Sequence, residues 1–281
     1  MKTPTVSVIM PVWNGARYLN EAVQSILDQN FKDFELIIVD DASTDETSEI
    51  LKNLSEIDSR ITVIRNEKNI QLPASLNVGF RHSKGFWLTW TSDDNIMEKD
   101  CLEILTESVK TREAKFVFTD YKIINSEGAF VKISKTGPVE DILIENTIGA
   151  CFLYSREILD VIGEYAEDKF MFEDYEYWVR ISKAGFRMMH LGEKCPYRYR
   201  IHNFQLSHQR KLPAEFVLYR YSLIREINDN NKKARAYLSV FRLSIRHKIP
   251  NIAFRSLVKI LLLNPSISLP VITALIVKRI K

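Results

Sequence analysis

The sequence is poor in cysteine and lacks the glycine-rich motifs by which many α/β proteins bind nucleotides. Three cysteines occur among 281 residues. An odd number without clustered spacing argues against a disulfide framework and favours a reducing compartment. Neither G-x-G-x-x-G nor G-x-x-x-x-G-K-[ST] is present. A dinucleotide fingerprint or a P-loop is therefore a poor interpretation of this chain.

The sequence also lacks a long hydrophobic run. The longest candidate, residues 267–277, contains Pro270 and is shorter than the ~20 apolar residues that a membrane-spanning helix needs. The apolar run 6–10 ends at Pro11, which predicts a strand rather than a signal peptide. We therefore expect a cytoplasmic protein, and the inner face of the membrane is an alternative place of action.

Acidic residues almost disappear after His208, where Glu215, Glu226 and Asp229 stand among many lysines and arginines. The net charge of +3 thus combines an acidic first part with a basic end, which suggests two parts with different roles. With 46% hydrophobic residues, the chain can form one large core and a smaller appendage. We place the boundary near residue 210, which divides the chain into 1–210 and 211–281.

Strand and helix patterns alternate through the first part. Apolar runs predict strands, and amphipathic segments between them predict helices. Ser43 and Glu46 predict a capping box at the start of one such helix. Repeated β-α units predict a Rossmann-like, doubly wound α/β sheet. The strands are expected at 6–12, 35–40, 61–65, 86–91, 114–124 and 129–134, and the helices at 16–30, 44–54, 74–83, 98–109, 156–162 and 175–184.

Polar residues follow three of these strands, in the segments PVWNG (11–15), VDDAS (39–43) and SDD (92–94). Carboxyl ends of parallel strands meet at one edge of a sheet, where open α/β sheets bind ligands. A carboxylate after the second strand can accept a hydrogen bond from the imide of uracil or thymine, or from N1–H of guanine. The alternative is that Asp40 and Asp41 serve the turn and the next helix N-terminus.

The neighbouring carboxylates of Asp93 and Asp94 repel each other, and burial increases that cost. Mg²⁺ or Mn²⁺ takes one or two protein carboxylates together with phosphate oxygens. We interpret the pair as a metal site that a diphosphate completes. The alternative is a cap for the helix expected at 98–109.

A second acidic pair, Glu173 and Asp174, lies at the start of a predicted helix in FEDYEYWVR (172–180). Arg198, Arg200 and His202 follow in YRYRIHNFQLSHQ (197–209). An arginine and a neutral imidazole suit a metal-bound diphosphate leaving group. Taken singly, each residue has an ordinary interpretation, as a first-turn acid or as a packed or surface histidine.

Together, the ordered segments resemble family 2 glycosyltransferases with the GT-A fold, over about residues 5–208. VSVIMPVWNGARYLNEAVQSILDQNFKDFELIIVDDASTDET resembles their opening block, and NVGFRHSKGFWLTWTSDDN their metal-binding DXD region. EDYEYWVRISKAGF resembles the acceptor-side ED motif, and YRIHNFQLS the late R-x-H-x-x-S element. The sequence departs from the pattern at Trp13, where tyrosine is usual, and at Ser92, where the first acidic residue of DXD is expected.

The resemblance implies a GT-A mixed sheet flanked by helices, with a C-terminal helical appendage. It implies inverting transfer of a sugar, of the hexosyltransferase type, from a UDP-, dTDP- or GDP-linked donor. The acceptor is expected to be a hydroxyl of a glycan or lipid-linked molecule in cell-surface glycan biosynthesis. The implied cofactor is Mn²⁺ or Mg²⁺.

The resemblance also assigns roles to residues of this sequence. Asp174 matches the general base, with Glu173 beside it. Asp94 and His202 are expected at the metal, and because Ser92 replaces an acid, Asp93 is expected nearer the ribose. The donor-binding residues are then Pro11, Trp13, Asp41, Asp93 and Arg200.

The alternatives to a glycosyltransferase are a nucleotidyltransferase and a non-catalytic binding protein. A nucleotidyltransferase would need a Gly/Arg/Lys-rich loop after the first strand, where only Gly15 and Arg17 occur. A non-catalytic binding protein would be favoured by loss of Asp94 or Asp174, and both are present.

Residues 249–281 mix apolar faces with Arg and Lys, which is typical of helices at a membrane surface or of a packed appendage. Nucleic acid is not an expected partner, because no base-reading motif accompanies the charge.

Overall fold

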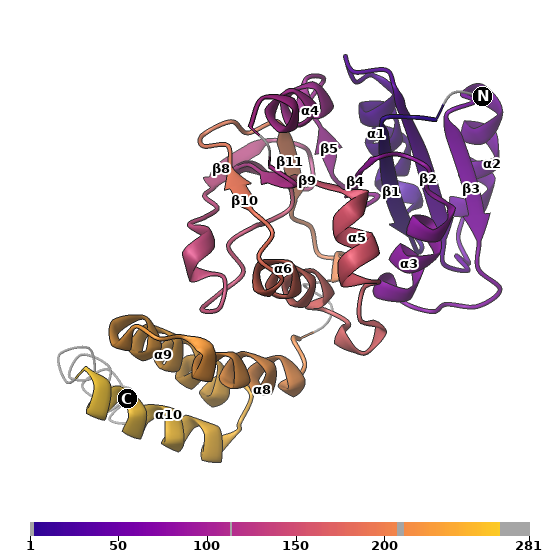
Figure 1. Ribbon diagram of the computed structural model, residues 1–281. Coiled ribbons are helices and arrows are strands. Elements are labelled where there is room, and N and C mark those ends of the chain that lie inside the picture. The colour runs from indigo at the N-terminus through magenta and orange to yellow at the C-terminus, as the bar shows by residue number, and fades with distance from the viewer. Residues whose placement is uncertain (1–2, 113, 207–210, 265–281) are drawn as a thin grey trace. The chain divides into compact units, whose positions relative to one another are not determined.

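The computed structural model describes residues 3–112, 114–206 and 211–264 (Figure 1). These residues form two compact units. The described residues up to 139 and those of 148–206 form the first unit, while 140–147 and 211–264 form the second. The stretch 140–147 lies in a part of the sequence without clear periodicity, so its grouping with distant helices was not apparent from the sequence.

Within the described residues, a seven-stranded sheet with the order β10-β6-β9-β4-β1-β2-β3 organises the first unit. β9 runs antiparallel to its neighbours, and the other strands are parallel. The carboxyl ends of β1, β2, β4, β6 and β10 therefore meet at one edge. The strands are β1 (Val6–Val12), β2 (Phe34–Asp40), β3 (Ile61–Arg65), β4 (Trp87–Trp90), β6 (Phe116–Phe118), β9 (Phe152–Ser155) and β10 (Met188–His190).

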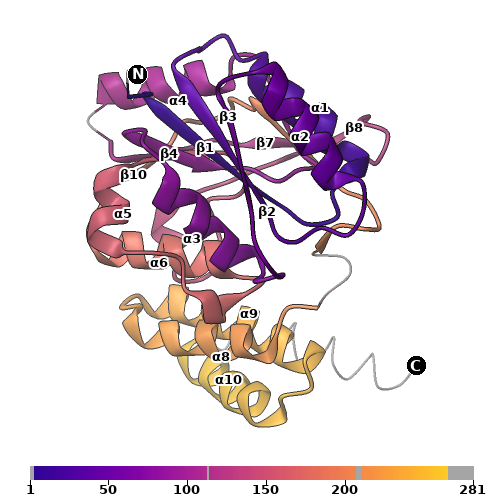
Figure 2. The same cartoon turned by 90° about the vertical axis from the view of Figure 1, so that its right-hand side faces the viewer.

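Helices cover both faces of this sheet (Figure 2). On one face, aliphatic residues of β1 pack with α1, α2 and α4. On the other face, Gly79 of α3 lies against Ile9, and aromatic residues of β6 and β9 pack on Trp178 of α6. The helices are α1 (Ala16–Leu27), α2 (Thr47–Ile57), α3 (Leu72–His82), α4 (Cys101–Arg112), α5 (Arg156–Ile162) and α6 (Glu173–Lys183).

One predicted helix start is wrong, and the alternative interpretation of Asp93 and Asp94 as a helix cap is not met. α2 begins at Thr47, and the Ser43 hydroxyl instead accepts a hydrogen bond from the Asn14 N–H at 3.0 Å. The predicted capping box is therefore absent, because Ser43 serves the turn after β1. α4 begins at Cys101, and the short strand β5 (Ile96–Met97) lies between it and Asp94. Asp93 and Asp94 are thus too far from α4 to cap it.

A second, four-stranded sheet with the order β5-β11-β7-β8 lies in the same unit. The strand predicted over 114–124 is divided between the two sheets, because the chain leaves β6 at Phe118 and enters β7 (Tyr121–Ile124). β11 (Tyr197–Arg200) pairs with β5 and β7, while β8 (Phe130–Ser134) pairs with β7. The pairing of β11 with β5 brings residues after 197 beside the segment that follows β4.

The second unit is helical in its described part. α8 (Ala214–Leu223), α9 (Asn230–Arg246) and α10 (Pro250–Leu263) pack around a small apolar core to which Ile144 contributes. Asp141 pairs with Lys232 and Arg235 of α9, both at 3.0 Å. No helix within the described residues is long and apolar enough to cross a membrane.

Candidate active site

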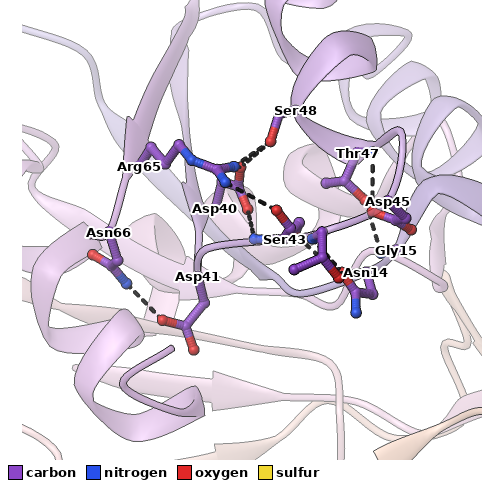
Figure 3. A network of polar contacts seen from close by, with 11 residues as sticks. Asn14, Gly15, Asp40, Asp41, Ser43, Asp45, Thr47, Ser48, Arg65 and Asn66 are labelled. Carbon is purple, nitrogen blue, oxygen red and sulfur yellow. Dashed lines mark hydrogen bonds and ion pairs between the residues drawn. The ribbon is translucent and has the colours of Figure 1, made fainter. Parts of the chain in front are cut away.

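The turn after β1 is fixed by the loop after β2 (Figure 3). Asn14 has a left-handed backbone (φ 55°), and its side-chain oxygen accepts from the Thr44 N–H at 2.8 Å. The Gly15 N–H donates to the Thr47 hydroxyl at 3.0 Å. Pro11 lies buried inside β1, whereas the Trp13 side chain is 49% exposed at the sheet edge. Trp13 is thus accessible to a ligand at the place that the sequence predicts.

Asp40 serves the turn, as the alternative interpretation of VDD anticipated. Its buried carboxylate accepts from the Ser43 N–H at 2.9 Å and the Ser48 hydroxyl at 2.7 Å, and it pairs with Arg65 (Figure 3). Burial alone would raise the pKa of Asp40, but these hydrogen bonds and the Arg65 charge lower it. The protein therefore stabilises this negative charge by itself.

Asp41 points away from Asp40 toward a loop after β3 (Figure 3). Its Oδ1 accepts from the Asn66 amide and the Ile70 N–H, both at 2.8 Å. Its Oδ2 accepts from the Gln71 N–H at 2.9 Å. A carboxylate oxygen can accept two hydrogen bonds, so Oδ2 keeps capacity for a base N–H. Base recognition by Asp41 stays a prediction.

Asp93 lies directly against the turn after β1. A Cβ at position 15 would lie 1.7 Å from the Asp93 Oδ2, so only glycine permits this close approach. Burial, together with the charges of Asp94 and Asp45, raises the pKa of Asp93 to about 8. This carboxyl group is therefore an unfavourable place for negative charge unless a cation is added.

Asp94 is hydrogen-bonded to His202, with 2.9 Å between Oδ2 and Nε2. The Phe204 N–H donates to His202 Nδ1 at 3.2 Å. Because Nδ1 accepts, Nε2 carries the proton that is donated to Asp94. Burial raises the pKa of Asp94, and the His202 hydrogen bond lowers it only in part. β11 thus brings His202 to Asp94 across a long stretch of sequence, as the predicted joint site requires.

Arg200 is buried and fully engaged in the structure. Its Nε donates to the Asp94 backbone oxygen at 2.9 Å, and one terminal nitrogen pairs with Glu21 at 2.6 Å. Its other terminal nitrogen donates to the Ser126 carbonyl at 3.2 Å, and the guanidinium lies over the Tyr18 ring. Arg200 therefore holds the Asp94 backbone in place. Direct contact with a donor stays a prediction that would require it to leave these partners.

Glu173 and Asp174 occupy the first turn of α6, as predicted. Burial, together with the charge of the neighbouring Asp174, raises the pKa of Glu173 to about 8. The Glu173 Oε2 is buried without a hydrogen-bond partner among the described residues. Tyr165, between α5 and α6, stacks on Tyr177 with ring centroids 4.1 Å apart and accepts from the Trp90 indole at 3.1 Å. These contacts join the start of α6 to the end of β4.

The site suits a metal ion that is shared with a ligand rather than one enclosed by protein. No group of three or more His, Cys, Asp or Glu side chains in the described ranges could hold a metal ion. Asp94 Oδ2 and His202 Nε2 lie 2.9 Å apart, and a cation bound by both would require the ring tautomer that carries its proton on Nδ1. Mg²⁺ and Mn²⁺ commonly bind one or two carboxylates and complete their shell with phosphate oxygens and water. The residues present fit that arrangement.

The sequence interpretation missed several residues that shape this edge. Asn66 holds Asp41, and Glu21 pairs with Arg200. Asp120, after β6, is buried, its Oδ1 is hydrogen-bonded to His190 at 2.9 Å, and its Oδ2 forms an ion pair with Lys135 at 3.0 Å. An apolar run that ends in aspartate, as in FVFTD, was a signal for Asp120, because VDD and SDD have the same form. No comparable sequence pattern points to Asn66 or Glu21 as a residue of the site.

Comparison with known proteins places this chain among glycosyltransferases. Residues 7–163 match the model of the family described as glycosyl transferase family 2. A putative teichuronic acid biosynthesis glycosyltransferase of Bacillus subtilis, TuaG, is 30% identical over 232 residues, covering 80% of this chain and 90% of that protein. An uncharacterized glycosyltransferase of Haemophilus influenzae is 28% identical over 220 residues, covering 73% of this chain and 68% of that protein.

The fold is similar to that of Staphylococcus aureus TarS, residues 1–349, solved in complex with UDP-GlcNAc. The TM-score is 0.65 with 19% sequence identity, over 85% of this chain and 72% of that chain. At this identity the likeness concerns the fold alone. It confirms the predicted GT-A type of mixed α/β sheet flanked by helices.

Proposed function

Because the chain belongs to glycosyl transferase family 2, we propose that it moves a sugar from a nucleotide diphosphate donor to a hydroxyl acceptor with inversion. The acceptor oxygen attacks the anomeric carbon as the bond from that carbon to the diphosphate oxygen breaks. The proton of the hydroxyl passes to a protein carboxylate, and the electron pair of the broken bond leaves with the diphosphate. A single displacement of this kind inverts the anomeric centre, as in one-step glycosidases.

The observation that carries the proposal is the convergence of β1, β4 and β11 on one acidic point. The Asp93 carboxylate lies against Gly15, and Asp94 is 2.9 Å from His202. Burial raises the pKa of both aspartates. A site in which burial opposes the ionisation of two neighbouring carboxyl groups favours a ligand that arrives with a divalent cation.

The donor is proposed to bind with its base at Trp13 and Asp41. An exposed indole can stack on a base, and Asp41 Oδ2 keeps one acceptor position. This arrangement favours UDP, dTDP or GDP over ADP, whose base has no matching N–H donor. The complex of TarS with UDP-GlcNAc supports a nucleotide-sugar donor for a protein of this fold.

At the diphosphate, Asp94 and His202 are the proposed metal-binding residues, with Asp93 beside them. Mn²⁺ or Mg²⁺ bound there would neutralise charge on the departing diphosphate. The Asp94 backbone is held by Arg200, so this carboxylate is positioned before any ligand binds. Pro11 contributes to the same pocket only by shaping the end of β1.

Asp174 is proposed as the general base, with Glu173 as its neighbour on α6. The raised pKa of Glu173 favours its protonated form at neutral pH, which makes it the weaker candidate for the base. A carboxylate positioned at the acceptor hydroxyl accepts its proton as the attack develops. We therefore assign the base to the more exposed member of the pair.

The acceptor is proposed to be a glycan or lipid-linked saccharide of the cell surface. The similarity to TuaG, named for teichuronic acid biosynthesis, supports this class. We also propose that the transferred sugar is a hexose, as the family resemblance of the sequence implies.

The test is a panel of nucleotide sugars, assayed for thermal stabilisation and for release of nucleoside diphosphate, with and without Mn²⁺. We expect stabilisation by uridine, deoxythymidine or guanosine diphosphate sugars, and only with the metal. A preference for ADP-linked sugars would contradict the assignment of Asp41. Metal-independent binding of every donor would contradict the assignment of Asp94.

A further inference from the structure

α10 in the second unit carries two apolar faces, and the fold uses one of them. Ala253 and Ile260 are buried in a small core that Phe241 of α9 completes. Ser256, between them along the same face, is also buried. This inner face accounts for the packing of α10 on α9 and leaves the opposite side of the helix to solvent.

The outer face of α10 is apolar as well. Phe254 is 68% exposed and Leu262 is 73% exposed, with Val258 and Leu261 between them. At 100° per residue these four positions fall within an arc of about 100°. Single exposed apolar side chains are ordinary, but a continuous stripe on one helix face marks an interaction surface.

Two cations border the outer face of α10. Arg255 and Lys259 are exposed one turn apart on the flank of the stripe. Within the described residues neither makes an ion pair. The sequence contains no Asp or Glu after Asp229, so α10 and most of α9 present charge of one sign. A partner for this surface must therefore combine an apolar phase with negative charge.

We propose that the outer face of α10 binds the surface of an anionic lipid bilayer. Phe254, Val258, Leu261 and Leu262 enter the boundary between headgroups and acyl chains, and Arg255 and Lys259 remain at the level of the lipid phosphates. Helices of this composition lie in the interface plane with their apolar side about 5–10 Å deep. The long stems of Arg and Lys allow their charges to stay in water while the stripe is buried.

Two other occupants fit this face less well. A second copy of the chain, related by twofold symmetry, would place its own Arg255 and Lys259 against the same cations. Nucleic acid satisfies the positive charge but offers no apolar phase for Phe254 and Leu262. A bilayer with anionic lipids satisfies both requirements.

The experiment is co-sedimentation of the full chain with vesicles, without donor or acceptor, so that its result is independent of the proposed reaction. Vesicles of phosphatidylcholine and phosphatidylglycerol in equal parts should bind the chain, and vesicles of phosphatidylcholine alone should bind it much more weakly. Raising the salt from about 0.1 M to about 1 M shortens the Debye length from about 10 Å to about 3 Å. Binding to the mixed vesicles should then fall without disappearing, because the apolar contribution remains.

Variants separate the apolar contribution to vesicle binding from the electrostatic contribution. Phe254→Ser with Leu262→Ser should weaken binding to the vesicles at least about tenfold, because serine does not bury the apolar area that Phe254 and Leu262 bury in the bilayer. Arg255→Glu with Lys259→Glu should weaken it about fivefold or more for each cation removed. Phe254→Trp should retain binding, because indole suits the interface. The matched controls lie on α2 of the first unit: Ile57→Ser, at a side chain 76% exposed, and Lys52→Glu.

The proposal is overturned if the chain does not sediment with anionic vesicles, or binds neutral vesicles equally. It is also overturned if Phe254→Ser with Leu262→Ser binds as the wild type does. Sedimentation velocity of the same variants identifies the rival occupant. If the wild type is a dimer that these substitutions dissociate, and vesicles do not bind it, the stripe is a contact between copies. Unchanged melting curves by circular dichroism show that each variant remains folded.

Discussion

The dipeptide Asp-Asp occurs at the end of β2 and again after β4, and the two pairs differ in how far the protein stabilises their negative charge. Asp40 and Asp41 receive hydrogen bonds from backbone N–H groups and side chains on every carboxylate oxygen. The pKa of Asp40 is lowered in spite of burial. After β4, burial and the charge of Asp94 raise the pKa of Asp93 to about 8, and burial raises the pKa of Asp94.

The direction of the pKa shift distinguishes a carboxylate with a structural role from one whose charge is stabilised only when a ligand binds. A charge that the fold itself neutralises contributes to stability and has little reason to bind a cation. A charge that the fold leaves uncompensated is costly until a cation arrives. By this criterion Glu173 belongs with the pair after β4, because burial and Asp174 raise its pKa to about 8.

The largest expected effect is that of Asp174→Asn on turnover. The substitution keeps the shape of the side chain and removes its basicity, so the rate should fall about 10²–10⁴-fold. Donor affinity in the presence of metal should stay near that of the wild type, as for an interaction made chiefly in the transition state. Steady-state kinetics and calorimetry measure the two quantities. Glu176→Gln, on the same helix and paired with Arg180, is the control. Retained turnover, or lost donor binding, would move the base to another residue, with Glu173 first.

Asp94→Asn tests whether the uncompensated pair binds the cation. We expect metal-dependent donor binding to weaken by on the order of 2 kcal/mol or more, about thirtyfold in Kd, because a charged ligand is lost. Calorimetric titration with nucleoside diphosphate and Mn²⁺ measures this. Asp58→Asn, at a surface aspartate paired with Arg60, should leave it unchanged. An undiminished Mn²⁺ effect in Asp94→Asn would place the metal elsewhere.

A stability comparison of Asp40→Asn with Asp93→Asn sharpens the contrast between the pairs. Asp40→Asn should lower the free energy of unfolding by about 1–3 kcal/mol, because it weakens charge-assisted hydrogen bonds at a buried position. Asp93→Asn should be neutral or stabilising at neutral pH without metal, since a neutral amide replaces a carboxyl group whose ionisation burial and Asp94 oppose. Urea unfolding of both variants measures these changes. Equal destabilisation by the two substitutions would show that the pairs do not differ in this way.

The smallest expected effect is a pH dependence of stability whose sign differs between the two pairs. The pKa of Asp93 is higher in the folded state than in the unfolded chain, so the folded state binds more protons between pH ~4 and pH ~8. Its contribution to stability is present below that window and is lost as pH rises through it. Even one unit of effective shift amounts to about 1.4 kcal/mol. The lowered pKa of Asp40 acts oppositely, and its contribution is lost as pH falls through the folded value.

Unfolding measured across this pH range without metal should show the loss in the wild type. Asp93→Asn should show a shallower slope, and the part that remains is expected from Glu173. Saturating Mn²⁺ with nucleoside diphosphate should flatten the wild-type curve, because the cation favours the ionised pair. A wild-type slope identical to that of Asp93→Asn would contradict the assigned shift.

Much of the first unit could be predicted from the sequence, because its signals are local. The apolar runs at β1, β2, β3 and β4 and the amphipathic helices between them come from short-range patterns. The acidic pair at the start of α6 was predicted for the same reason. The predicted capping box at Ser43 failed because a competing long-range partner, the Asn14 N–H, takes that hydroxyl.

What the sequence alone determined is the order of the β-α units and the position of three acidic pairs at element ends. Only the tertiary structure decided which pair the fold neutralises, because several of the neutralising groups are distant in sequence. Asn66 reaches Asp41, and Arg65 reaches Asp40, across the sheet edge. His202 reaches Asp94 because β11 pairs with β5, a strand too short to predict. The sequence determines where a carboxylate occurs, but the free energy of its ionised form depends on the burial and the partners that packing supplies.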